Sequence, residues 1–204
     1  LVANSKDVDA DNRFAIVTDK NGNQYVQADR RVVLGNNPEM WKQQITRYIN
    51  ETIRKGNDIK IQTVEGDTLT INANTAGKAA FQNADFSESD FKTKLIAEAH
   101  IDEIAYVSKA KKNADGTKKI TPDHDNKHAK RNLAKDGWSY RTAYFRDFDG
   151  KYYKLQISVA IDGTVESIYN VGSIKEKHLS GESRLTPQRA TSVSNNSISE
   201  NSEK

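Results

Sequence analysis

Apolar and polar residues alternate most clearly between Trp138 and Val171, where Asp149-Gly150 and Asp162-Gly163 separate three β-rich runs. An Asp-Gly pair between alternating apolar positions is the strongest short-range signal for a β-hairpin. We therefore predict a three-stranded antiparallel meander. Two-residue turns at both Asp-Gly pairs would place Arg141 opposite Ser158, and Ser158 opposite Ser167.

This register divides the side chains of the meander between two faces. The first face is apolar and should form a core: Tyr140, Thr142, Tyr144, Tyr153, Leu155, Ile157, Val159 and Ile168. The second face is cationic, rich in hydroxyl groups and partly aromatic: Arg141, Phe145, Lys154, Gln156, Ser158, Ser167 and Tyr169. It is either the solvated side of an ordinary antiparallel sheet or a binding site, because Arg and Lys hold phosphates and Tyr stacks on bases.

Residues 13–73 carry the pattern of a small ββαββ unit. Residues 14–28 read as a hairpin that turns at Asn21-Gly22, and residues 59–72 read as a second one. Between them, Asn37-Pro38 begins an amphipathic helix that Gly56 ends. The unit contains no chemical motif, so its expected role is structural or docking.

A second helix is predicted from Ser87 to Ser108, with Ser87 as its N-cap. Apolar residues recur on two of its sides, which indicates that it lies across the core face of the meander. His100 is at the centre of this apolar helix. It is either a core histidine that donates to a carbonyl or to Glu103, or an acid or base that reaches past the edge of the sheet.

The segment 109–136 is rich in Lys, Asp, Asn and Gly and predicts a long loop. Within it, His124 and His128 have the spacing of a helical metal pair, but no Glu lies between them and no third ligand is evident, so we expect no metal. A loop that brings His128 and Lys127 to the polar sheet face is the better interpretation. Overall we expect an α+β protein with four parts: a disordered linker (1–12), the small unit (13–73), the helix with its antiparallel sheet (74–179) and a disordered tail (180–204).

Composition narrows the function only slightly. The net charge is +3 and there are no cysteines, which excludes disulfides and thiolate metal sites. No run of residues is apolar enough to span a membrane, the first residues do not form a secretory signal, and the missing initial Met indicates a piece of a longer polypeptide. We expect the protein to be cytoplasmic and to need no cofactor.

Two sequence segments resemble those of a known family. They are AHIDEIAYVSK and, downstream of it, WSYRTAYFRDFDGKYYKLQISVAIDGTVESIYNVGSIKE. Together they resemble domains embedded in large polyvalent proteins of phages and mobile elements, and GNQYVQADRRVVLG also looks like sequence of such proteins. These domains are similar to the nuclease group that unites barnase, EndoU, colicin-type tRNases and RelE. The resemblance covers residues 88–178 and implies helices followed by a four-stranded antiparallel sheet.

The resemblance further implies phosphodiester cleavage by residues of the helix and of the exposed sheet face. By position these are His100, Arg141 and Tyr169, with His128 from the loop. Metal-independent RNA cleavage needs a base, an acid and cations that stabilise the charge on phosphate, and His and Arg suit these roles. Arg141 would grip the phosphate bidentately. The residues expected to bind substrate are Lys127, Lys154, Gln156, Ser158 and Ser167. The polar face carries no carboxylate that could act as the general base, as one does in barnase. In this respect the sequence departs from the pattern of the nuclease group.

Two other functions fit the same residues. The domain could be a non-catalytic module that binds nucleic acid or a protein with the polar face, or a structural part of a polyprotein. The partners implied are RNA for a catalytic domain, and an immunity protein or the remaining polyprotein otherwise.

Overall fold

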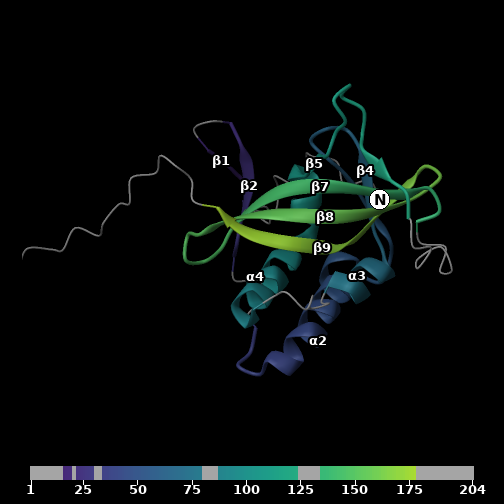
Figure 1. The fold of residues 1–204 in the computed structure, drawn as a ribbon. Helices are drawn as coiled ribbons and strands as arrows, with labels where there is room; N and C mark the ends of the chain where they lie inside the picture. The colour runs from purple at the N-terminus through teal and green to yellow at the C-terminus, as the bar shows by residue number, and fades with distance from the viewer. Residues whose placement is uncertain (1–15, 20–21, 30–33, 80–86, 124–133, 178–204) are drawn as a thin grey trace, which may run out of the picture.

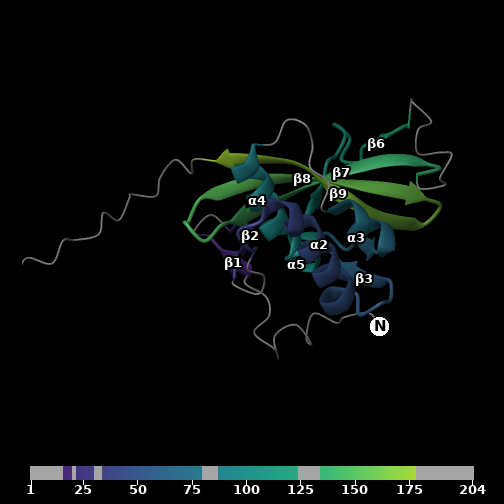
Figure 2. The same cartoon turned by 90° about the horizontal axis from the view of Figure 1, so that it is seen from below.

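The computed structural model describes residues 16–19, 22–29, 34–79, 87–123 and 134–177. Its strands form one mixed sheet in the order β1-β2-β7-β8-β9-β4-β3, and β5 and β6 pair with β7 beside this path. The helices lie together on one side of the long strands β7, β8 and β9, as Figure 1 and the view from below in Figure 2 show. The expected α+β class is confirmed. The predicted linker and tail, residues 1–12 and 180–204, lie outside the described residues.

The elements have the following bounds. The strands are β1 (Ile16–Thr18), β2 (Gln24–Gln27), β3 (Ile59–Gln62), β4 (Thr68–Ile71), β5 (Lys109–Ala110), β6 (Ile120–Thr121), β7 (Gly137–Arg146), β8 (Tyr152–Asp162) and β9 (Val165–Lys177). The helices are α2 (Pro38–Tyr48), the π-helical turn η1 (Ile49–Ile53), α3 (Ala73–Ala79), α4 (Glu88–Glu98) and α5 (Ile101–Val107).

The first two hairpins form, but they do not make the predicted ββαββ unit. The β1-β2 hairpin joins the sheet through β2, which runs parallel to the end of β7, while β3-β4 joins it through β4, which runs parallel to β9. The two hairpins therefore flank the meander on opposite sides. The described residues between 16 and 73 complete the sheet of the later strands, and Val26 and Leu69 of the two hairpins are buried in the common core.

The helices begin at the predicted caps. The side chain of Asn37 accepts a hydrogen bond from the amide of Glu39 at the start of α2, and Ser87 accepts one from Asp90 at the start of α4. The predicted helix 87–108 is wrong in one respect, because it breaks at Ala99 and His100 into α4 and α5. No Pro or Gly marks this break in the sequence.

The register of β7 against β8 differs from the prediction by one residue. Arg141 lies opposite Ile157, and Asp147 closes a three-residue loop against Lys151. The Asp147 carboxylate accepts the amides of Asp149 and Lys151 through Oδ1, both at 2.9 Å, and Gly150 takes a positive φ of 79°. A type I turn followed by a left-handed glycine gives this loop.

A slip of one residue exchanges the two faces of a strand. Arg141 and Phe145, expected on the open face, are 0% exposed on the core face with Leu155 and Ile157. The residues Tyr140, Thr142 and Tyr144, expected in the core, lie on the opposite face. The predicted face assignment of β7 is therefore wrong.

The β8-β9 hairpin also shifts, but by two residues, so its faces stay as predicted. Gly163 and Thr164 form the turn, and Val159 lies opposite Ile168. The core residues predicted on β8 and β9 are all buried: Tyr153, Leu155, Ile157, Val159 and Ile168.

The buried guanidinium of Arg141 links distant parts of the sheet. Its Nη1 lies 2.6 Å from Asp67 Oδ2 and its Nη2 3.3 Å from Glu65 Oε2, both in the turn between β3 and β4. Its Nε donates to Ser108 Oγ at 2.8 Å, and Nη2 donates to the Ser108 carbonyl at 2.9 Å. One side chain of β7 thus holds the β3-β4 turn and the end of α5.

A second basic residue, Lys118, also holds the β3-β4 turn in place. Lys118, between β5 and β6, bonds to Asp67 at 2.9 Å and to Glu166 of β9 at 2.5 Å. Burial acts to raise the pKa of Asp67, but the hydrogen bonds and positive charges of Arg141 and Lys118 outweigh it, so the pKa lies below its usual value. These contacts curl the sheet so that β3-β4 meets the β5-β6 segment.

We predict that Arg141→Ala lowers the free energy of unfolding by about 3 kcal/mol. Breaking a buried ion pair by removing one partner costs about 3–5 kcal/mol, and the lower end applies because Asp67 and Glu65 keep some contact with water. The control Arg146→Ala, on the opposite face of the same strand, should cost about 1 kcal/mol or less. Urea unfolding measures both, and equal stability of the two variants would contradict the structural role of Arg141.

Candidate nucleic-acid interface

The face of β7, β8 and β9 that points away from the helices is ordered in rows across the three strands. From the β8-β9 turn toward the β7-β8 loop, the pairing aligns Trp138 with Ala160 and Ser167, then Tyr140 with Ser158 and Asn170, then Thr142 with Gln156 and Ser173, then Tyr144 with Lys154 and Lys175, and finally Arg146 with Tyr152. We call this surface the open face. In Figure 2 it looks away from α2, α3, α4 and α5.

The rows differ in chemistry along the strands. The end near the β8-β9 turn is aromatic, where Trp138 and Tyr169 meet edge to face with ring centroids 5.1 Å apart. Hydroxyl and amide groups fill the middle rows. The other end is cationic: Lys154 and Lys175 are exposed and lie opposite each other, and Tyr144 precedes them in the same row.

Two bulges in β9 shape the open face. Tyr169 is inserted between Ile168, opposite Val159, and Asn170, opposite Ser158. Gly172 is inserted in the same way before Ser173. Bulges redirect side chains and increase the local twist, and both act here on the strand that carries the predicted Tyr169.

The space around the second bulge is tight. A Cβ on Gly172 would lie 3.3 Å from Ser158 Oγ and 3.8 Å from Asn170 Oδ1. The main chain of β9 therefore lies against the hydroxyl and amide groups of the middle rows.

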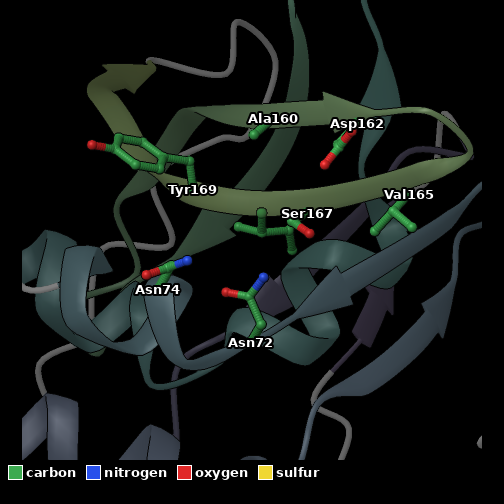
Figure 3. A pocket seen from close by; sticks show the side chains of 8 residues that line it. Asn72, Asn74, Ala160, Asp162, Val165, Ser167 and Tyr169 are labelled. Atoms are coloured by element: carbon green, nitrogen blue, oxygen red, sulfur yellow. The ribbon is translucent and has the colours of Figure 1, made fainter. Parts of the chain in front are cut away.

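A small pocket lies at the aromatic end, between the open face and the segment that links β4 to α3. Its volume is about 230 Å³, and its lining is half polar: Asn72, Asn74, Ala160, Asp162, Val165, Ser167, Ile168 and Tyr169. Figure 3 shows the ring of Tyr169 on the left, Asp162 and Val165 on the right, and the amide groups of Asn74 and Asn72 below them.

Five of the predicted site residues lie together on the open face: Lys154, Gln156, Ser158, Ser167 and Tyr169. Arg141 does not join them, because it is buried on the other face among protein partners. Lys127 and His128 lie outside the described residues. Sequence reasoning missed Tyr140, Tyr144 and Arg146 on this face, since it assigned the tyrosines to the core.

His100 lies in the core and not at the open face. Its side chain is 0% exposed, its Nδ1 lies 2.6 Å from Glu103 Oε2, and its ring packs 5.9 Å from that of Phe145. The hypothesis of a core histidine bonded to Glu103 is confirmed by this contact. The predicted grouping of His100, Arg141 and Tyr169 does not form, because the first two lie under the sheet and the third lies above it.

The described residues offer no metal site. Within the ranges that the structure describes, no three His, Asp or Glu side chains are grouped to hold a metal ion. Among the same residues, no helix has the length and apolar character to cross a membrane.

A second buried titratable pair lies beneath β9. Lys94 and Glu98 of α4 are both 0% exposed, with Nζ and Oε1 3.4 Å apart. Burial raises the pKa of Glu98 to about 8, against the lowering effects of the Lys94 charge and of the Val171 amide. Glu98 therefore holds its proton at neutral pH and lies behind the strand segment between the two bulges.

Comparison with protein-family models, with curated proteins and with solved structures finds no match for this chain. The resemblance to the nuclease group that includes barnase and RelE stays an expectation.

The raised pKa of Glu98 predicts a pH-dependent stability. Since the folded state holds this proton up to about pH 8 and an exposed Glu loses it near pH 4.5, the contribution is complete below pH 4.5 and is lost as pH rises through 8. Glu98→Gln should flatten the stability profile between pH 5 and 9 while leaving stability at pH 5 within about 0.5 kcal/mol of the original. Urea unfolding across this range measures it. An unchanged slope in the variant would show that Glu98 is ionised in the folded state.

Proposed function

We propose that this chain is a binding module for single-stranded nucleic acid, with RNA as the first candidate, and that the open face is its binding surface. The observation that carries the proposal is the order of the rows, with aromatic rings at one end, hydroxyl and amide groups in the middle and cations at the other. An ordinary solvated face has no need of this arrangement.

Each part of the open face suits one part of a nucleotide. The half-exposed rings of Tyr140, Tyr144 and Tyr169 can stack on the bases of a single strand, whereas Trp138 is buried against Ala134 and Ala160 and supports them from behind. Hydroxyl and amide groups such as those of Ser158 and Gln156 bond to sugars and base edges. Lys154 and Lys175 supply charge for phosphates, and a short strand laid across the rows would meet all three.

The charge balance of the open face favours an anionic ligand. The described side chains include three cations, Arg146, Lys154 and Lys175, and one carboxylate, Asp162. That carboxylate is bonded to Lys135 at 3.1 Å and lies at the end farthest from the cations. The net charge of +3 of the whole chain does not reveal this concentration.

Binding is better supported than cleavage by the described residues. RNA hydrolysis without a metal needs a base and an acid that reach the ribose and the leaving oxygen. His100, the histidine within the described ranges, is buried beneath the sheet with Glu103. A binding function needs only the surface that the described strands provide.

Binding is tested by fluorescence anisotropy with a labelled eight-nucleotide RNA, in EDTA, beside a duplex of the same sequence. The single strand should bind more tightly, because a duplex hides the faces of its bases. Tyr144→Ala should weaken binding roughly 5- to 150-fold, since base-aromatic stacking is worth about 1–3 kcal/mol. The matched variant Tyr144→Phe keeps the ring and should bind normally.

Charge is tested in the same assay with Lys154→Gln. This variant should weaken binding and reduce the salt dependence by about 0.7 in the slope of log K against log salt, the amount for one phosphate of a single strand. Lys92→Gln removes an exposed lysine of α4, on the other side of the sheet, and should change neither value. No binding by the unmodified protein, or normal binding by Tyr144→Ala, would overturn the proposal; cleavage of the RNA would favour the nuclease alternative.

A further inference from the structure

The pocket at the aromatic end of the open face has the size of a site for one ring system. Its 230 Å³ would hold seven or eight waters at about 30 Å³ each, and pockets for drug-sized ligands begin near 300 Å³. A single nucleobase fits this scale, whereas a whole nucleotide would leave its sugar and phosphate outside, over the open face.

The apolar part of the lining suits the flat faces of a base. Ala160, Val165 and Ile168 contribute methyl groups, and the ring of Tyr169 closes one end (Figure 3). Tyr169 is held in place by its edge contact with Trp138. Tyr169 lies at the first bulge of β9, two residues after Ser167, and both residues line the pocket.

The polar part of the lining offers both donors and an acceptor. The Oδ1 of Asn72 accepts the amide of Thr75 at 3.1 Å, so the amide group is fixed with its NH₂ as the end available for a ligand. Asn74 is exposed and brings a second amide.

Asp162 supplies the acceptor. Of the described residues, Lys135 is the one that bonds to it, and it does so through Oδ2. A carboxylate accepts from an exocyclic amino group and repels a carbonyl oxygen.

We infer that this pocket binds one base of the nucleic-acid strand and selects bases that carry an exocyclic amino group over uracil. The inference rests on the proposed function of the open face. The pocket row and the row of Lys154 are six residues apart along β8, about 20 Å. An eight-nucleotide strand is long enough to place a base in the pocket and phosphates at the cations.

Cytosine and uracil provide a matched comparison. The two rings have the same size and differ at position 4, where cytosine carries an amino group and uracil a carbonyl oxygen. A difference in affinity between oligocytidine and oligouridine therefore reports the group that faces Asp162, with little contribution from stacking.

The experiment measures the binding of eight-nucleotide oligocytidine and oligouridine by anisotropy at one salt concentration. The unmodified protein should bind oligocytidine at least fivefold more tightly. Asp162→Asn should abolish this ratio, because an amide can donate to the uracil carbonyl as readily as it accepts from cytosine. Asn74→Ala should reduce the affinity for both oligonucleotides.

The control is Asp149→Asn, which removes one exposed carboxylate at the opposite end of the sheet and changes the net charge by the same amount. It should leave the ratio unchanged. Thermal midpoints of all variants should agree within a few degrees, since the Lys135–Asp162 pair is exposed.

The outcomes separate this inference from the proposed function. Equal binding of the two oligonucleotides by the unmodified protein, or a ratio that persists in Asp162→Asn, would overturn the base pocket and leave the open face as a binding surface. Failure to bind either oligonucleotide would overturn the proposed function itself, and the pocket assignment with it.

Discussion

The carboxylate of Asp147 holds the loop that sets the register of β7 against β8. It accepts the amides of Asp149 and Lys151, and the hydroxyl of Tyr153 donates to its other oxygen at 3.0 Å. This arrangement requires a three-residue loop between β7 and β8. The loop fixes the register, and the register decides that Arg141 points into the core while Tyr140 and Tyr144 point out of it.

Burial of a guanidinium imposes conditions on the rest of the chain, because a buried charge must be paired and fully hydrogen-bonded. Asp67 and Glu65 provide the negative charge, Ser108 accepts from Nε and Nη2, and the Thr63 hydroxyl accepts from Nη2 as well. These partners come from the β3-β4 turn and the end of α5, so the charge that β7 buries also brings an early hairpin against later elements. The one-residue register shift of β7 removes Arg141 from the open face and lets it hold the β3-β4 turn against α5. The same shift places Tyr140 and Tyr144 on the open face, where they can meet a ligand.

The sequence predicted the three long strands, both outer hairpins and the start of two helices, because each depends on local signals such as Asn37-Pro38 and the Asp-Gly pairs. The prediction was wrong where one sequence signal is compatible with two loops: the Asp149-Gly150 pair fits a two-residue loop as well as the three-residue loop that forms. Asp147 and Gly150 stand at the first and last positions of a type I turn, which Asp-Gly alone does not reveal. The burial of Arg141 depends on Asp67, 74 residues away, and no local pattern reports such a partner.

Part of the candidate site could also be predicted from the sequence, because it depends on the alternation of side chains along β8 and β9. The assignments on β8 and β9 survive because that hairpin shifts by two residues, which keeps Ser158, Ser167 and Tyr169 on the open face. The pocket beside Tyr169 could not be foreseen, since Asn72 and Asn74 reach it only because β4 pairs with β9.

The central claim is that ligands meet the open face and not the groups beneath the sheet. Nuclear magnetic resonance of the side-chain N–H groups tests it most directly during titration with single-stranded RNA. The amide signals of Gln156 and Asn170 should shift with RNA concentration, while the Nε–H signal of Arg141 and the ring signals of His100 should stay in place. Shifts at Arg141 and His100 with unchanged signals from Gln156 and Asn170 would contradict the account.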